Sequence, residues 1–332
     1  MDVNTQGFKN ATSLSTFDLN RVRGVGMEGF YNCYCLHITL SSTLTGIGDR
    51  AYHGCYYSGT KLTIPKSVSM IGTEAFSTWV QLEEIVFGVP DVRLILSKQA
   101  FKGLYNLKSM TLPTSTEMAE GIFDGCYSLE SISVPYIGLN KDGTKTSHQS
   151  ETTLGYLFSQ EAYENSYEVK VVYEKTATTH DIMYFYIPLS LKKVTITAQE
   201  AIGDYAFDGI TSLNTIVLPE TVEAIGKYSF AYTTITGITL PNGINSIEEY
   251  AFTHCESLRS ITIPFNTNAI MENAFYGCTA LGNVIFENQV NWHIYVNGTI
   301  SYNVDVSNSS LMANHFVGQY HNSSWHRYEE NN

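Results

Sequence analysis

The chain has 332 residues, of which 43% are hydrophobic, enough for an extensive core in one large or two ordinary domains. Its 32 acidic and 19 basic side chains give a formal charge of −13, which repels nucleic acid and anionic membrane surfaces. No stretch approaches the roughly 20 apolar residues needed to span a bilayer, and the first residues lack the basic and apolar segments of a signal peptide. We therefore expect a folded protein with no nucleic-acid partner and no membrane insertion.

An aromatic residue, usually preceded by alanine, recurs along the chain and marks an internal repeat. The markers are Phe8, Phe30, Tyr52, Phe76, Phe101, Phe123, Phe207, Phe230, Phe252 and Phe275. Successive markers lie 22 to 25 residues apart, except for a gap of 84 between Phe123 and Phe207. Around each marker the template I-G-x-x-A-F-x-G-C-x-x-L-x-x-I-x-I-P holds, as in "AFTHCESLRSITIP" at 251–264. A fixed period of this length predicts a repeat architecture, and because the template is already under way at Phe8 we expect sequence before residue 1.

Each repeat predicts one coil of a solenoid. The "IxIP" segment alternates apolar and polar residues, so Ile216 and Leu218 point inward and Val217 points outward on a short strand that Pro219 ends. The glycine of "IG" is expected to allow a tight bend. One coil cannot bury its own apolar side, so coils must stack, with their strands in a parallel sheet about 4.8 Å apart. We expect eleven such strands, near residues 17, 39, 63, 86, 111, 133, 195, 217, 239, 262 and 285.

The long gap is interpreted as one coil enlarged by an insertion. In that coil Leu157 and Phe158 take the place of the missing marker pair, and polar runs such as "SQEAYENSY" form surface loops or a flap. A second domain is the alternative, disfavoured by the low apolar content. At the other end, Trp292 and Trp325 are expected to cover the last coil. The predicted organisation is a single domain, 1–332, with repeats at 1–135, an insertion-bearing repeat at 136–190, repeats at 191–286 and a C-terminal cap at 287–332.

The template resembles the BspA-like, or treponemal-type, leucine-rich repeat family, whose units carry "IGxxAFxGCxxLxxIxIP". The match covers nearly the whole chain, and "LGYLF" at 154–158 and the closing segment 307–327 also resemble elements of bacterial members. The resemblance implies an α/β-type, right-handed leucine-rich-repeat solenoid, with a parallel β-sheet on the concave face and short turns or 3-10 segments on the convex face. It also implies a secreted or surface-displayed protein of bacteria or protists that binds macromolecules and has no catalytic activity.

The cysteines indicate packing rather than metal binding. Five of the six, Cys33, Cys55, Cys126, Cys255 and Cys278, follow a marker by three residues. Other repeats place Ala11 or Leu104 at this position, so we expect buried, free thiols. Cys35 falls at a leucine position, and the spacing contains no paired motif for zinc. A disulfide between Cys33 and Cys55 of stacked coils is a disfavoured alternative, and no metal or cofactor is expected.

No catalytic signature is present in the sequence. The chain lacks G-x-S-x-G, HExxH, GxxxxGK[ST] and a GxGxxG that follows a strand. We therefore expect a non-enzyme, and a hydrolase site beneath the 136–190 insertion is the alternative.

The outward side of the predicted strands is the candidate binding surface. Its candidate residues are Thr39, Thr63, Thr111, Ser133, Thr195, Thr239, Thr262, His37, Lys61 and Lys193. The surface is rich in hydroxyls and nearly neutral, although threonine also favours strands for structural reasons. Solenoids usually bind partners on such a sheet.

The expected partner is a protein of a host or neighbouring cell, contacted in adhesion by a monomeric protein at the cell surface or outside the cell. A glycan is the alternative partner, because tyrosines cluster at Tyr56 and Tyr57 and at Tyr184 and Tyr186, where exposed rings can stack on sugars.

Overall fold

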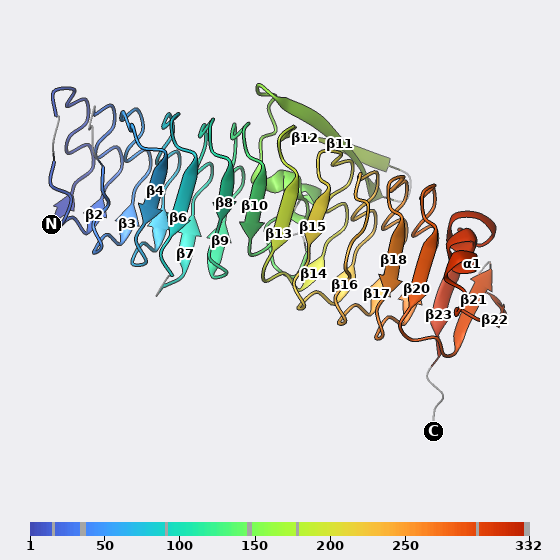
Figure 1. Cartoon of the computed structure of the whole chain (residues 1–332). Coiled ribbons are helices and arrows are strands. Elements are labelled where there is room, and N and C mark those ends of the chain that lie inside the picture. Colours follow the sequence, from blue (N-terminus) through green and yellow to red (C-terminus); the bar gives the residue numbers. More distant parts are fainter. Residues whose placement is uncertain are drawn as a thin grey trace. The chain divides into compact units, whose positions relative to one another are not determined.

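Each marker repeat forms one coil in a computed structural model of the chain, which describes residues 1–14, 17–33, 38–89, 92–144, 148–176, 179–296 and 299–328. The coils group into two compact units. Unit 1 comprises Met1–Pro135, Gly155–Glu168 and Phe185–Leu191, and unit 2 comprises Tyr136–Leu154, Val169–Tyr184 and Lys192–Asn332. Figure 1 shows the coils of unit 1 from blue to green and those of unit 2 mainly from yellow to red.

The marker rings form a continuous stack inside unit 2. Ring centroids lie 5.3 Å apart between Phe207 and Phe230, 4.9 Å between Phe230 and Phe252, and 5.2 Å between Phe252 and Phe275, with the ring planes within 11° of parallel. These rings are fully buried. Since each ring covers the face of the next, the stack shields apolar surface that a single coil would leave in water. The predicted alignment of the markers is confirmed.

Unit 1 repeats this arrangement and includes the predicted replacement for the missing marker. Phe8, Phe30 and Tyr52 stack at 5.3 and 5.5 Å. The amide of Phe123 donates to the carbonyl of Leu157 at 2.9 Å, and the Phe158 ring lies 5.8 Å from that of Phe123. Leu157 and Phe158 therefore occupy the marker position, as predicted.

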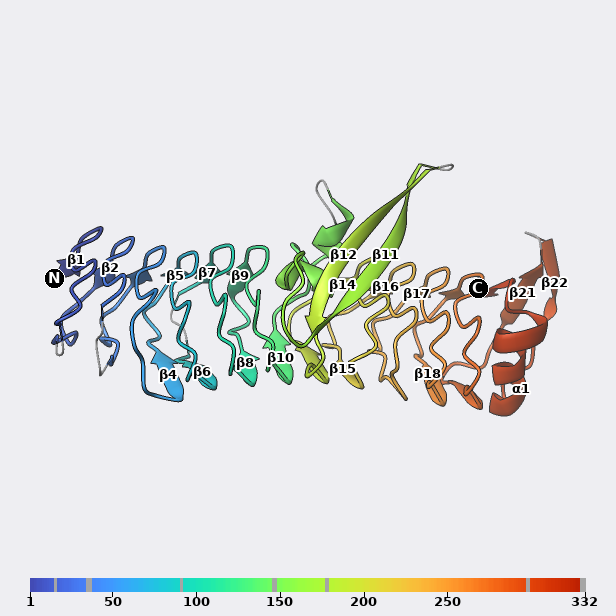
Figure 2. The same cartoon turned by 90° about the horizontal axis from the view of Figure 1, so that it is seen from above.

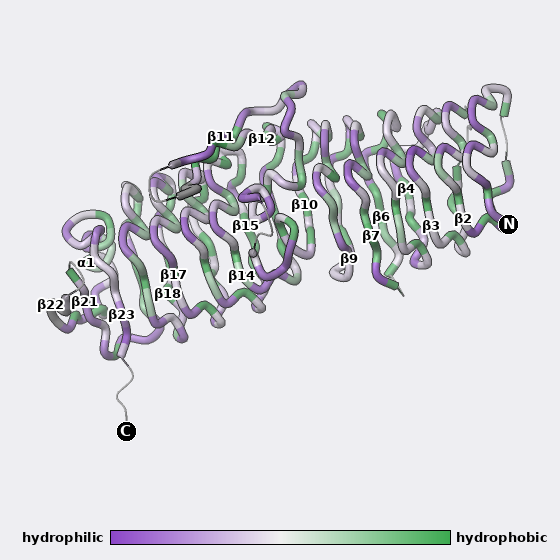
Figure 3. The backbone as a smooth tube through the Cα atoms, turned by 180° about the vertical axis from the view of Figure 1, so that it is seen from behind, coloured by the Kyte–Doolittle hydropathy of each residue, from purple (hydrophilic) through white to green (hydrophobic). Residues whose placement is uncertain are grey.

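The "IxIP" segments form parallel sheets in both units. Unit 1 contains β4 Lys61–Ile64, β6 Glu84–Phe87, β8 Ser109–Thr111 and β10 Ser131–Val134, paired in that order. Unit 2 contains β13 Lys193–Ile196 paired with β15 Thr215–Val217, and β18 Ser260–Ile263 paired with β20 Asn283–Phe286. Figure 3 shows how apolar positions recur from coil to coil along these segments. The predicted fold class, a parallel-strand solenoid of the leucine-rich-repeat type with little helix, is confirmed.

The described residues of two predicted strands, 17–19 and 38–40, form no strand, and the residues just before them lie outside the described part of the chain. A third predicted strand is wrong, because residues 238–240 form no strand. In the last case Gly237 precedes the segment and Pro241 follows it. Glycine weakens a strand because it has no side chain to pack and high conformational entropy, and proline cannot donate to a ladder.

A second set of parallel strands, which the sequence did not reveal, forms a separate sheet in each unit and lies just before the template position of the repeat glycine. Its strands in unit 1 are β1 Asp2–Val3, β2 Gly24–Val25, β3 Gly46–Ile47, β5 Met70–Ile71, β7 Leu94–Leu96 and β9 Thr116–Met118. In unit 2 they are β14 Ala201–Ile202, β16 Ala224–Ile225, β17 Ser246–Ile247 and β19 Ala269–Ile270. Neighbouring strands of each set pair in parallel.

A glycine follows five of these ten strands, and close packing explains it better than the predicted tight bend. A Cβ atom on Gly72 would lie 2.4 Å from the amide nitrogen of Asp49, and one on Gly226 would lie 2.8 Å from that of Asp204. Neither glycine has a positive φ. Glycine is required because the backbone of the preceding coil approaches too closely for any side chain.

The insertion contains two short 3-10 helices and a pair of long strands. The helices are η1 Gln149–Thr152 and η2 Leu154–Leu157, and the strands are β11 Ser166–Thr176 and β12 Thr179–Pro188. The strands pair with each other in a two-stranded sheet, which Figure 2 shows from above, and Tyr186 of β12 also forms an isolated antiparallel bridge with Ser159. Along β12 the exposed residues alternate with more buried ones, so one side of the pair faces solvent.

The C-terminal segment of unit 2 covers the last coil. It contains β21 Trp292–Val296, β22 Thr299–Asn303, α1 Ser309–Asn314, the π-helix η3 His315–Gln319 and β23 Ser324–Arg327. Strand β23 pairs antiparallel with β19, so the parallel order ends there. The Phe316 ring lies 5.2 Å from the last marker, Phe275, and 4.5 Å from Trp325. Trp292 and Trp325 are both fully buried, so their predicted place over the last coil is confirmed.

Candidate functional site

The candidate binding surface, termed the strand face, consists of the outward-pointing residues of β4, β6, β8 and β10 in unit 1 and of β13, β15, β18 and β20 in unit 2, with the extended segments between them. In unit 1, Thr63 lies beside Val86, and Thr111 lies beside Ser133, in neighbouring strands. Lys61 forms an exposed ion pair with Glu84 at 3.0 Å. Thr63 and Thr111 are exposed, whereas Ser133 is half-buried. Unit 1 therefore presents a row of hydroxyls beside one neutralised charge pair.

The remaining candidates of unit 1 differ in position. Thr39 is exposed in the segment 38–40, which forms no strand, and His37 lies outside the described residues. Beside this surface, Lys108 donates to Glu83 at 2.9 Å, and this hydrogen bond raises the pKa of Lys108. The charges around the strand face of unit 1 are thus largely paired.

In unit 2 the candidate threonines alternate with aliphatic residues. Thr195 pairs in register with Val217, and Thr262 pairs with Ile285. Val217 is 41% exposed and Ile285 is 49% exposed. Lys193 lies next to Thr215 and is exposed. The prediction treated the face as a hydroxyl surface and gave no weight to these two aliphatic side chains.

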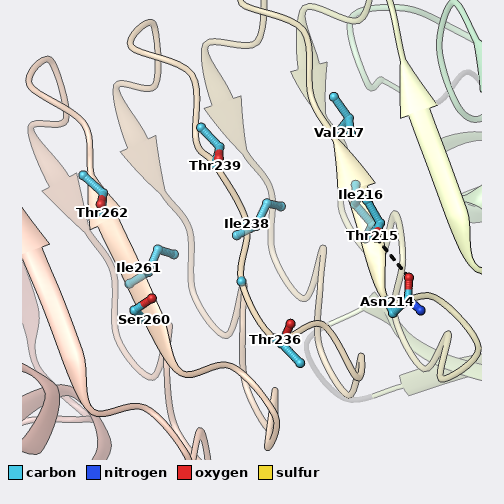
Figure 4. Close-up of a pocket in the computed structure, with 11 residues that line it drawn as sticks. Asn214, Thr215, Ile216, Val217, Thr236, Ile238, Thr239, Ser260, Ile261 and Thr262 are labelled. Carbon is cyan, nitrogen blue, oxygen red and sulfur yellow. Dashed lines mark hydrogen bonds between the residues drawn. The ribbon is translucent and has the colours of Figure 1, made fainter.

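A depression opens in the strand face of unit 2 where one coil forms no strand. It has a volume of about 590 Å³ and is lined by residues 214–217, 236–239 and 260–262. Figure 4 shows Thr239 and Ile238 of the middle segment between the strands that carry Thr215 and Thr262. Gly237 is part of the lining, and a Cβ atom added there would contact nothing within 4 Å. The other coils carry a side chain such as Lys193, Thr215 or Ser260 at this register, so the glycine leaves space.

The depression also exposes backbone groups. Among these described residues, no backbone hydrogen bond joins 237–240 to β15 or β18. The hydroxyl of Thr215 donates to the side-chain oxygen of Asn214 at 3.0 Å, and Thr239 is exposed. The depression thus combines hydroxyls, an amide and unpaired backbone groups with the aliphatic side chain of Ile238, which suits a neutral polar ligand or peptide group. The sequence signal for it was Gly237, the only glycine in its template column.

The other sequence predictions concern thiols, metals and membranes. Cys33, Cys55, Cys126, Cys255 and Cys278 are buried thiols outside any disulfide, as predicted, and Cys35 lies outside the described residues. Within the described ranges no three His, Cys, Asp or Glu side chains gather to hold a metal ion. In the same ranges no helix has both the length and the apolar character to cross a membrane.

The repeat defines the class of protein. The model of the family described as "BspA type Leucine rich repeat region" matches the chain in six copies, over residues 2–130, 89–150 and 181–296. The protein therefore belongs to the BspA-type leucine-rich repeat family. A comparison with curated proteins gave no match.

Solved structures similar to this chain include bacterial leucine-rich repeat proteins. One, from Bacteroides ovatus, is 25% identical, with a TM-score of 0.42, over 85% of this chain and 75% of its own. The pneumococcal vaccine antigen PcpA is 22% identical, with a TM-score of 0.34, over 82% of this chain and 62% of its own. A leucine-rich cell surface protein from Faecalibacterium prausnitzii is 20% identical, with a TM-score of 0.31, over 87% of this chain and 83% of its own.

Proposed function

We propose that this protein is a non-catalytic binding protein that acts at a cell surface or outside the cell, where its strand face mediates adhesion to a protein of a host or neighbouring cell. Membership of the BspA-type family supports this proposal, because repeat solenoids of this kind generally mediate protein interactions. We further propose that the chain acts as a monomer and that the solenoid forms a single domain.

The observation that carries the proposal is the depression around Gly237 in the strand face of unit 2. Its polar lining and exposed backbone groups lie close to two exposed aliphatic side chains, Val217 in its lining and Ile285 on β20. A partner surface that fills the depression would exclude water from the aliphatic side chains and form hydrogen bonds with the polar groups. Such a combination of buried apolar and paired polar groups is typical of the centre of a protein interface. In such an interface, the neutral hydroxyl side chains of Thr195, Thr239 and Thr262 contribute shape complementarity and hydrogen bonds to the partner rather than charge.

The test is a binding screen followed by a strand-face variant. The purified chain is immobilised and probed with fibronectin, laminin and collagen by surface plasmon resonance. For any protein that binds, Thr239→Arg places a bulky cation in the depression and should weaken binding at least about tenfold. The matched control is Thr114→Arg, an exposed turn residue of unit 1, which should leave affinity unchanged.

Two outcomes count against the proposal. If Thr239→Arg and Thr114→Arg bind the partner with equal affinity, the contact lies elsewhere on the molecule. If none of the proteins binds but a glycan array gives hits that Thr239→Arg abolishes, the partner is a carbohydrate and the adhesion to protein is wrong.

A further inference from the structure

The C-terminal segment that covers the last coil of unit 2 is rich in histidine. Four of the nine histidines of the chain, His293, His315, His321 and His326, lie in it. Histidine is the side chain whose ordinary pKa, about 6.5, lies closest to neutral pH, so its surroundings decide whether a mild acidification charges it. The environment of these four rings therefore determines how this segment responds to acid.

His315, the first residue of the π-helix η3, has a buried nitrogen. Its Nδ1 is shielded from solvent and has no hydrogen-bond partner among the described residues. The imidazole meets the Tyr320 ring edge-on, with centroids 4.9 Å apart, and lies 6.2 Å from the Trp325 ring of β23. Tyr320 is the only ionisable side chain in ring contact with His315 in the described part of the chain. Burial alone lowers the pKa of His315, and no carboxylate of these residues opposes this shift.

A positive charge on His315 is unfavourable while the segment is closed. A protonated imidazole carries an N–H group on both nitrogens, so Nδ1 would present a donor and part of the charge to a place without an acceptor among the described residues. When the segment opens, water solvates the charged ring. The closed form therefore excludes a proton that the open form accepts.

His293 and His326 lie directly opposite each other in the antiparallel strands β21 and β23. Their chain neighbours Ile294 and Trp325 are fully buried, so the two imidazoles share the other face of the sheet. The His326 ring meets the Tyr295 ring edge-on at 4.9 Å, and burial lowers the pKa of His326. His326 therefore also resists protonation while the strands are paired.

The groups around His326 do not favour a further positive charge. β19 places Ala269 opposite it, β21 places His293 opposite it on the other side, and Arg327 follows it in β23. The guanidinium of Arg327 is held by Oδ1 of Asn268 at 3.0 and 2.6 Å. No carboxylate of the described residues contributes to the pKa of His326. Once both histidines are protonated, like charges lie opposite each other in neighbouring strands, which weakens the pairing of β21 with β23.

His321 differs from the other three histidines and is not part of this effect. Its Nδ1 lies 2.8 Å from Oδ1 of Asn273, which accepts from an Nδ1–H group, and its carbonyl oxygen accepts from the Asn273 amide at 2.6 Å. Both contacts are available to the neutral and to the charged imidazole. Protonation of His321 therefore leaves this attachment of the segment intact.

We propose that the C-terminal segment of unit 2 is an acid-sensitive latch on the last coil, in which protonation of His315 and of the His293–His326 pair loosens η3 and β23. The open form accepts protons at about pH 6.5 and the closed form only at lower pH, so the free energy of opening falls as the pH drops below about 6.5. Opening uncovers the ring of Phe275 and the edge of β19, which Phe316 and β23 otherwise cover. The latch residues differ from those of the strand face, and the inference does not depend on the proposed function.

Hydrogen exchange followed by mass spectrometry tests the latch in the full chain. Exchange is measured at about pH 7.5 and about pH 5.0, and each rate is divided by the intrinsic rate of an unfolded peptide at the same pH. The corrected opening should rise about 5- to 30-fold at the lower pH in peptides that contain β19 and β23, because opening takes up at least one proton. Peptides that contain β1 to β3 should change less than about twofold.

Three variants assign the rise to the histidines. His315→Gln keeps a polar side chain that cannot be charged and should reduce the rise to less than about half. His315→Gln combined with His326→Gln should reduce it to about twofold or less. The control His180→Gln removes an exposed histidine of β12 and should keep the full rise. A loss of protection that a variant causes equally at both pH values cancels in this ratio.

Two results overturn the inference. In the first, β19 and β23 of the parent open no more at the lower pH than at the higher one, or β1 to β3 open by the same factor, so that acid loosens the whole chain. In the second, the double variant keeps the full rise. The carboxyl of Asp208 cannot mimic the expected result, because burial raises its pKa to about 7 and lowering the pH then stabilises unit 2.

Discussion

In six coils, the side chain three residues after the marker donates to the carbonyl oxygen of the marker in the preceding coil. The thiol of Cys55 donates to Phe30 at 2.9 Å, and that of Cys278 donates to Phe252 at 3.0 Å. Trp79 occupies the same column and donates through Nε1 to Tyr52 at 3.0 Å. The sequence suggested a purely apolar position, but the structure shows that a weak or buried donor is used there to pair an inner carbonyl. Burial raises the pKa of Cys126 to about 12, so this thiol stays protonated and able to donate.

Asp208 follows a marker directly and is 9% exposed, with no hydrogen-bond or ion-pair partner for its carboxylate in the described residues. Burial raises its pKa from 3.8 to about 7. The folded state therefore holds a proton that the unfolded state releases above about pH 4, so the free energy of unfolding falls as pH rises from 4 to 7 and then levels off.

Asp208→Asn should remove this pH dependence. The variant should match the parent near pH 4 and be more stable near pH 8, by up to the order of 4 kcal/mol. Urea unfolding at the two pH values measures the effect. A stability difference that is the same at both would show that the carboxyl titrates normally in the folded protein.

At the scale of elements, the short strands of the second sheet depend on how closely adjacent coils approach. β14 and β16 have only two residues each, Ala201–Ile202 and Ala224–Ile225, yet they pair in register. Gly226 follows β16 with room for no side chain, since its Cβ would meet the backbone of Asp204 at 2.8 Å. A Cβ atom added to Gly237, which lies later in the chain, would instead meet no atom within 4 Å. Two glycines eleven residues apart thus serve opposite purposes, close packing and the opening of the depression.

Gly226→Ala and Gly237→Ala form a matched test of this difference. The first should destabilise unit 2 by about 1 to 3 kcal/mol or more, because the backbone of the preceding coil must shift. The second should change stability by less than about 1 kcal/mol in either direction. Thermal unfolding followed by circular dichroism distinguishes them, and equal losses would contradict the close-approach explanation.

At the scale of the whole molecule, a solenoid is stabilised mainly by contacts between neighbouring coils, so its ends need covers. The C-terminal segment covers the last coil of unit 2. Its Trp325 is fully buried and packs against Phe316, with the two ring centroids 4.5 Å apart. Because β23 pairs with β19 in antiparallel order, this segment also ends the hydrogen-bond ladder. Stability in such an array is approximately a sum of coil and interface contributions.

Trp325→Ala should therefore destabilise the C-terminal coils first. The expected loss is about 3 to 5 kcal/mol for the local unfolding of β19 and β23. Hydrogen exchange followed by mass spectrometry should show faster exchange in these two strands than in β1 to β3. The control Tyr328→Ala, which removes a ring that is 44% exposed, should leave exchange unchanged. Uniform acceleration along the chain would mean that the coils unfold as one cooperative unit.

Much of this fold was predictable from the sequence. The row of Phe207, Phe230, Phe252 and Phe275 followed from spacing alone, whereas Phe158 was predicted as a substitute marker because Leu157 and Phe158 form an apolar-aromatic pair within the long gap. The absence of a strand at 238–240 was not predicted, because the alternation around Thr239 indicates a strand and the weakening effect of Gly237 overrides it. Thr63, Thr111, Thr195 and Thr262 lie on strands in register with their neighbours, whereas Thr39 and Thr239 lie in segments that form no strand. Which of these residues bind a partner stays a prediction.

By itself the sequence determined that the chain coils, since apolar residues recurring every 22 to 25 positions are buried only when successive repeats stack. Only the tertiary structure decided which surfaces are distinctive. Whether a Cβ clashes at Gly226 and whether space opens at Gly237 both depend on the residue that the adjacent coil presents. That residue lies about one repeat away in the sequence, and the register between coils sets its distance.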